Sequence, residues 1–214
     1  TCVSDGESAT ISDTLGNLLF FVHGISLYSQ PNTKIIDNNF IMMQNGDSII
    51  GDNTYNSDII IPVPLNDSLY YHISCVSTSS AVHYTVIRKN NFQTNGVVIS
   101  KNNLLLSRTL SDCLNAVRHG NGRDWWIITR LGAIIPNDTF FVWLLEPNGI
   151  SGPYKQHAGI SKPDGIQRST FNNDGSQFTE VSYSGKIEEF NFDRCTGTIT
   201  SNRIIRNPFF GSYL

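Results

Sequence analysis

The chain has 214 residues, of which only 15% are charged, and its formal net charge is −3. Asn, Ser, Thr and Gly supply much of the remaining polar surface, a mixture typical of short strands joined by tight turns. No run of Lys or Arg gives the electrostatic footprint of a nucleic-acid binder, and no apolar run approaches the roughly eighteen residues that span a bilayer. The sequence therefore predicts no nucleic-acid partner and no transmembrane segment.

A turn signal recurs four times along the chain. Clusters of residues that accept positive φ or bond their own backbone lie at 14–17, 65–68, 120–123 and 173–176. A strand-like run follows each cluster at once, at 18–22, 69–73, 124–128 and 177–181. The starts of these runs are 51, 55 and 53 residues apart, which predicts an internal repeat of about fifty-three residues.

Further strands flank each of these runs. Short stretches of small and apolar residues precede the turns, at 9–12, 59–63, 114–119 and 166–171. A third strand is predicted at 25–29, 82–87, 140–145 and 186–192. Candidates for the fourth strand are 35–36 or 48–50 in the first unit, 97–99 with 104–106 in the second, then 154–157 and 198–205.

Four antiparallel strands repeated at this period predict an all-β fold, a β-propeller, because one small sheet cannot bury both of its faces unless neighbouring sheets stack on it. The expected fold has about four four-stranded blades, at residues 1–56, 57–112, 113–164 and 165–214, the last able to run into a further blade. A β-sandwich also shows short strands at regular spacing, but it does not predict the same order of turn and strands four times.

Several motifs carry a family resemblance. They are ATISD at 9–13 with GNLLF at 16–20, IIIPVP at 59–64, LNAVRH at 114–119 and EEFNFD at 188–193. Together they resemble the N-terminal, WD40-like propellers of surface and secreted proteins of Bacteroidetes-type bacteria, many of which carry a C-terminal domain for type IX secretion. The resemblance implies a secreted or outer-membrane-associated location, and it implies no general activity.

Both ends of the chain look like interrupted blades, so we expect part of a larger propeller of about seven blades. Exposed blade faces in such a fragment would favour self-association. A complete ring of four blades is the competing interpretation, since propellers of four blades exist.

The residue types that carry catalysis or bind metals are scattered. The cysteines at 2, 75, 113 and 195 form no C-x-x-C pair, and we expect most to be thiols, with disulfides left open. The five histidines show no metal-ligand spacing, and no nucleophile elbow or phosphate-binding loop occurs. The sequence therefore predicts no cofactor, no metal site and no catalytic residue.

A binding site at the mouth of the propeller channel is the one site hypothesis. Asp58, Asp112 and Asp164 lie near the starts of successive inner strands and could form a ring that takes a cation or a sugar. Arg130 begins a long polar segment between the second and third strands of its unit, where a partner could bind. Turn and capping roles are the competing interpretation of these acids.

Three functions follow from this pattern. The leading hypothesis is a non-catalytic binding or scaffold propeller of a secreted or cell-surface protein, with a protein or glycan ligand. The alternative is a propeller hydrolase or lyase that acts on carbohydrate or lactone through acidic residues at the channel mouth. An intracellular WD40 scaffold is disfavoured by the missing Trp-Asp signatures and by a period above the usual 40 to 45 residues, roughly.

Overall fold

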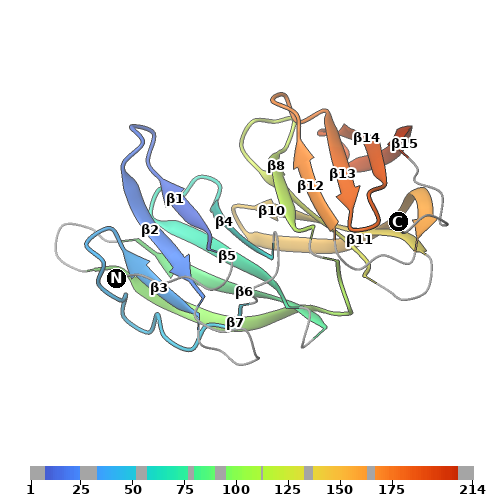
Figure 1. Cartoon of the computed structure of the whole chain (residues 1–214). Coiled ribbons are helices and arrows are strands. Elements are labelled where there is room, and N and C mark those ends of the chain that lie inside the picture. Colours follow the sequence, from blue (N-terminus) through green and yellow to red (C-terminus); the bar gives the residue numbers. More distant parts are fainter. Residues whose placement is uncertain are drawn as a thin grey trace.

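The fold is a β-propeller arrangement of antiparallel sheets, as the sequence predicted. The computed structural model describes residues 8–24, 33–51, 57–76, 80–89, 95–111, 113–132, 137–162 and 167–206. Within these ranges the chain forms fifteen strands in four sheets and no helix (Figure 1). The predicted fold class is therefore confirmed.

In every sheet the order of the strands in space follows their order in the sequence. The first sheet has three described strands: β1 (Thr10–Ser12), β2 (Leu18–His23) and β3 (Lys34–Asp37). The second has β4 (Asp58–Pro62), β5 (Leu69–Val76), β6 (Ala81–Arg88) and β7 (Val97–Ser107). The third has β8 (Asn115–Arg118), β9 (Trp125–Arg130), β10 (Asn137–Glu146) and β11 (Gly149–Lys162). The fourth has β12 (Gln167–Phe171), β13 (Gln177–Ser182), β14 (Ile187–Asp193) and β15 (Thr198–Arg206).

The first strands of successive sheets are neighbours in space. Strand β1 lies beside β4, β4 beside β8, and β8 beside β12 (Figure 1). From this inner row each sheet continues strand by strand toward the periphery. The turns that join the first and second strands of the four sheets therefore lie on the same side of the molecule, beyond the ends of the inner strands.

These four turns are held by side chains within the predicted turn clusters or directly before them. Side-chain oxygens of Asp13, Asn66, Asn121 and Asn172 accept hydrogen bonds from backbone N–H groups two to five residues later. Such bonds satisfy backbone donors that the strands leave unpaired at the turn. Gly175 has φ of 72°, a left-handed conformation that glycine adopts without a steric penalty.

Adjacent sheets pack face to face through alternating side chains. On β14, Glu188, Phe190 and Phe192 are buried toward the third sheet, whereas Asn191 on the opposite face is exposed. Phe190 packs edge-on against Phe140 of β10, with ring centroids 5.3 Å apart. Alternation along the strand therefore determines which face forms the interface.

Two further apolar clusters join the other sheets. Ile73 of β5 packs with Trp143 of β10 between the second and third sheets. Phe20 of β2 packs with Tyr70 of β5 between the first and second, their rings 5.2 Å apart. The consecutive residues Trp125 and Trp126 point to opposite faces of the third sheet, so each belongs to a different interface.

Two strand predictions need comment. The predicted strand at 25–29 lies outside the described residues, and the described strands that pair with β2 are β1 and β3. The two pieces predicted at 97–99 and 104–106 form the single strand β7, which bends at Asn102 (φ 60°) and pairs with β6 through register shifts. Asn102 accepts a hydrogen bond from the Ile50 amide, so the polar residues between the two predicted pieces connect β7 to the segment between β3 and β4.

A search of the described residues for a helix of the length and apolar character needed to cross a membrane finds none.

Replacing Phe190 by Ala should lower the free energy of unfolding by about 3–5 kcal/mol, because the ring is fully buried between two sheets. Val181→Ala is the matched control on the open face of the same sheet, where the side chain is 43% exposed. This control should change stability by about 0.5 kcal/mol or less. Urea unfolding followed by circular dichroism measures both, and equal losses would contradict the assignment of the two faces.

Candidate functional site

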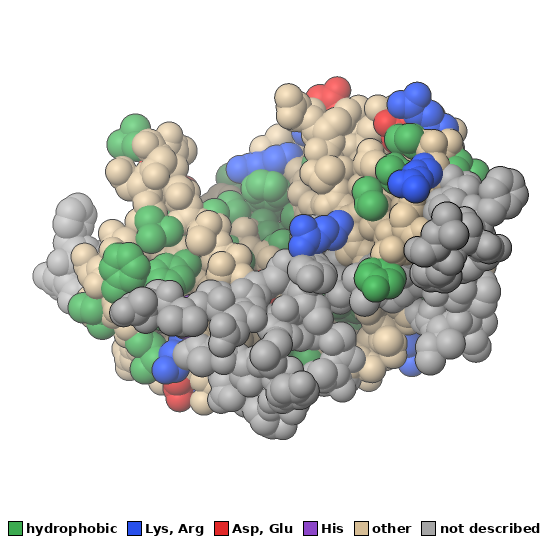
Figure 2. Space-filling model, viewed as in Figure 1, with side chains coloured by type: hydrophobic (Ala, Val, Ile, Leu, Met, Phe, Trp, Pro, Cys, Tyr) green, Lys and Arg blue, Asp and Glu red, His purple; other side chains and the backbone are tan. Residues whose placement is uncertain are grey.

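A groove of about 960 Å³ opens where the inner turns of the first three sheets come together. Its lining residues come from β1 and its following turn, from the β4–β5 turn, and from β8, β9 and the turn between them. Figure 2 shows the hollow between the two halves of the molecule, apolar in its depth and flanked by basic side chains. One site is thus built from three blades.

Apolar side chains form about half of the lining of this groove. Ile11 of β1, Ile60 of β4 and Trp125 of β9 line it, with Leu19 and Tyr70 from the second strands of their sheets. The run Pro-Val-Pro-Leu at 62–65 continues the same surface into the β4–β5 turn. A ligand with apolar groups would release water from this surface on binding.

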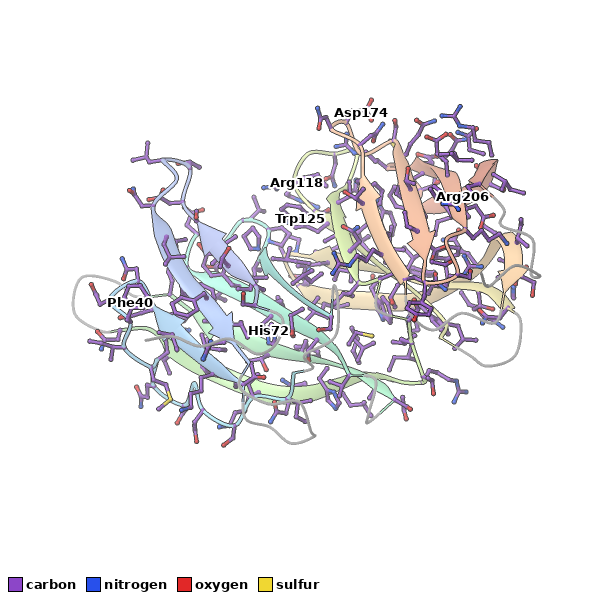
Figure 3. The ribbon with its side chains drawn as sticks, in the orientation of Figure 1. Phe40, His72, Arg118, Trp125, Asp174 and Arg206 are labelled. Carbon is purple, nitrogen blue, oxygen red and sulfur yellow. The ribbon has the colours of Figure 1, made fainter. Side chains whose placement is uncertain are left out.

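Arg118 is the best-positioned charge in the groove. Its guanidinium carbon lies 4.1 Å from the centroid of the Trp125 ring, and its Nη1 donates to the carbonyl oxygens of Gly122 and Arg123 at 3.3 and 3.1 Å. No described carboxylate pairs with it. Lys89, at the end of β6, lines the same groove, and no described group pairs with its ammonium either. Figure 3 shows Arg118 and Trp125 together on the inner side of the third sheet.

The other charged residues of the groove are largely committed to their own turns. Hydrogen bonds from Asn17 hold the pKa of the Asp13 carboxyl below its ordinary value. Arg123 donates from Nε and Nη2 to Asp124, and this contact lowers the pKa of the Asp124 carboxyl. Asp67 is exposed at the rim. The available positive charge is therefore that of Arg118 and Lys89.

Asp58, one of the predicted channel residues, is buried. His72 Nε2 lies 2.7 Å from its Oδ1, and the Ser57 hydroxyl donates to its Oδ2 at 3.4 Å. Asp58 borders a smaller cavity of about 350 Å³ beside the inner strands, where Asn115 of β8 is another lining residue. With only 8% of the residue exposed, the carboxylate serves first to pair with His72.

Arg130, the other described site residue, is fully buried between the third and fourth sheets. Its Nη1 donates to Glu180 Oε2 at 2.5 Å, and its Nη2 donates to the backbone oxygens of Asn137 and Ile160. The guanidinium also lies over the Phe140 ring, 4.9 Å from its centroid. Arg130 therefore ties two blades together and does not reach the groove.

A second buried carboxylate completes this contact between blades. Glu188 is the cross-strand neighbour of Glu180, and its Oε1 accepts a hydrogen bond from the Ile160 amide at 2.8 Å. The preceding residue, Gly159, has φ of 75°, and a Cβ there would collide with the Glu188 carboxylate and the Phe190 ring. The backbone N–H and C=O of Ile160 are thus both hydrogen-bonded to buried charged side chains, Glu188 and Arg130.

The remaining predicted site residues, Asp112 and Asp164, lie outside the described residues. The structure does not bring Asp58 and Arg130 together, because Asp58 pairs with His72 inside the second sheet, whereas Arg130 pairs with Glu180 between the third and fourth sheets. A ring of acids at the channel mouth stays a prediction. No cluster of three His, Cys, Asp or Glu residues with the geometry of a metal site occurs in the part of the chain that the structure describes.

The groove residues Arg118, Lys89 and Trp125 were not predicted as a site. Their signal in the sequence is weak, since a basic residue at the end of a strand is ordinary surface composition. A better signal was the position of Arg118 and Trp125 on either side of a predicted tight turn, which places them opposite each other on paired strands.

Either Arg130→Met or Glu180→Gln should lower the free energy of unfolding by about 3–5 kcal/mol, because each leaves a buried partner uncompensated. The double variant Arg130→Met/Glu180→Gln should be more stable than the sum of the single losses predicts. Urea unfolding of the four proteins forms a double-mutant cycle. Strictly additive losses would show that the pair does not act as a unit.

The described cysteines should differ sharply in reactivity. Burial raises the pKa of the Cys113 thiol to about 11, with Glu180 adding to the effect. At pH 8 this thiol holds about a hundredfold less thiolate than one with the ordinary value, and Cys75 is buried as well. Iodoacetamide with peptide mapping should label Cys195 in the native protein and label Cys75 and Cys113 only in urea. Native labelling of Cys113 at the Cys195 rate would contradict the burial.

No protein-family model matches the sequence, and no curated protein does. Among solved structures, the chain is similar to the periplasmic gluconolactonase PpgL of Pseudomonas aeruginosa, with a TM-score of 0.51 and 9% identity over 92% of this chain and 52% of that one. Hydrazine synthase of Kuenenia stuttgartiensis aligns with a TM-score of 0.44 and 10% identity, over 83% of this chain and 50% of that one. The chain thus spans about half the length of either protein. At such identity the likeness to the gluconolactonase shows the β-propeller fold and nothing about activity.

Proposed function

We propose that this chain is a non-catalytic binding propeller of a secreted or cell-surface bacterial protein, and that the groove of the first three blades is its ligand site. The proposed location rests on the resemblance of the repeat motifs to surface and secreted propellers. The site rests on the groove itself.

The observation that carries the proposal is an arginine side chain, Arg118, that is already held in place in the groove before any ligand binds. Arg118 is held by the Trp125 ring on one side and by two carbonyl oxygens on its Nη1. A side chain that is already ordered loses little further conformational entropy when a ligand arrives. The volume of the groove is at the upper end of the range of ligand sites, about 300–1,000 Å³.

Catalysis on carbohydrate or lactone is the competing function, and the structural likeness to a gluconolactonase is the reason to consider it. The acids that would serve it are poorly placed in this chain. Asp58 is bonded to His72, and Asp13 gives its oxygens to its own turn. The geometry therefore supports binding better than it supports turnover.

A paired substitution at the rim tests the groove. Leu65 is 79% exposed and lines it, whereas Leu15 is 85% exposed at the tip of the β1–β2 turn and does not. Leu65→Arg should obstruct the groove, and Leu15→Arg should leave it open, both without cost to the core.

The measurement is an array of glycans and of random peptides, probed with the wild-type protein and both variants. We expect at least one set of ligands that the wild-type protein and Leu15→Arg retain and Leu65→Arg loses. Hydrolysis of gluconolactone or of chromogenic glycosides by the wild-type protein, abolished by Leu65→Arg, would establish the enzyme instead. Equal binding by all three proteins would show that ligands bind elsewhere.

A further inference from the structure

We infer that the partner in the groove is a polypeptide segment that carries an acidic side chain flanked by apolar ones. The inference rests on the proposed function, because it takes the groove as the binding site, and it adds the chemistry of the ligand.

The Arg118 side chain presents one defined edge to a ligand. Its Nη1 is occupied by the carbonyl oxygens of Gly122 and Arg123, whereas Nε and Nη2 make no hydrogen bond to a described residue. These two nitrogens form the fork that matches the two oxygens of a carboxylate in a planar, side-on contact. Stacking on Trp125 holds the plane of the fork. A carboxylate is therefore the group that this edge recognises best.

The aromatic rings of the groove are poorly arranged for a sugar. Sugar rings stack on free aromatic faces, but Arg118 covers one face of Trp125, and Tyr70 is only 6% exposed. The other apolar part of the groove is aliphatic, with Ile11, Ile60 and the Pro-Val-Pro-Leu run at 62–65. Aliphatic side chains of a peptide match this surface, and the hydroxyl groups of a glycan would lose their hydration against it.

The dimensions and the second cation favour an extended segment over a single small acid. At about 960 Å³ the groove crosses from the first sheet to the third. Lys89 lines it from the second sheet, on a different blade from Arg118, and favours a second negative group near it, whereas the exposed Asp67 disfavours one at the rim of the β4–β5 turn. We therefore expect an acidic residue beside Arg118 and apolar residues on either side of it.

The experiment is a selection of a displayed library of random peptides on the immobilised protein, with Arg118→Ala as the groove variant. Arg206→Ala is the matched control, since Arg206 is an exposed arginine on β15, far from the groove (Figure 3). Peptides enriched on the wild-type protein and on Arg206→Ala should contain Asp or Glu next to Leu, Ile, Val or Phe. On Arg118→Ala the enrichment of acidic residues should disappear.

A peptide pair drawn from the selection, identical except for Glu or Gln at the acidic position, then measures the contact by fluorescence anisotropy. The wild-type protein should bind the Glu peptide about tenfold more tightly. Arg118→Ala should bind both peptides equally, and Arg118→Lys should keep only part of the preference because it lacks the fork.

Several results would overturn the inference. Enriched peptides without acidic residues, or a Glu preference unchanged in Arg118→Ala, would show that Arg118 does not recognise a carboxylate. Binding of uronate oligosaccharides in place of peptides, lost in Leu65→Arg, would make the ligand a glycan and leave the proposed groove intact. If no ligand of either class depends on Leu65, the proposed function fails together with the inference. Unchanged circular dichroism and thermal midpoint in each variant serve as the folding control.

Discussion

Each sheet in this chain is too small to bury its own two faces, and the whole structure depends on that constraint. A sheet with apolar or hydrogen-bonded side chains on both faces is stable only between two neighbours. The third sheet illustrates this, with Trp125 packed toward the second sheet and Trp126 toward the fourth. Because the first strands of the sheets lie side by side, the turns that follow them lie on one side of the molecule. The groove forms among these turns of the first three sheets.

The interfaces between sheets are of unlike chemistry. The first two are largely apolar, whereas the interface between the third and fourth sheets also contains Arg130, Glu180 and Glu188. Buried ion pairs add little net stability compared with apolar packing, but they penalise any misaligned arrangement heavily. The cluster of Arg130, Glu180 and Glu188 therefore contributes more to how the fourth sheet is positioned on the third than to the free energy of unfolding.

The repeat and its turns were predictable from the sequence because they depend on local chemistry, as Asn66 and Asn121 show by bonding the backbone a few residues later. The sites were not, because they depend on contacts across sheets. Arg130 was predicted to begin a loop that binds a partner, yet its guanidinium donates a hydrogen bond to Glu180, fifty residues later in the sequence. Arg118 is held within one hairpin, by the Gly122 and Arg123 carbonyl oxygens and the Trp125 ring, but the groove that it lines needs the turns of two other sheets. Spacing within a repeat predicts strands, and it does not indicate which side chains meet between repeats.

The close approach of Glu188 to the backbone at Gly159 links two positions that are far apart in the sequence. No side chain fits at position 159 while a glutamate occupies position 188, since the two would claim the same space. A shorter side chain at 188 would not by itself admit alanine at 159, because the Phe190 ring lies 2.7 Å from the same Cβ position and the φ of 75° is unfavourable for alanine. It would also leave the Ile160 amide without its acceptor. In a comprehensive library of variants, position 159 would therefore appear as a glycine that no single change in the neighbouring blade makes replaceable.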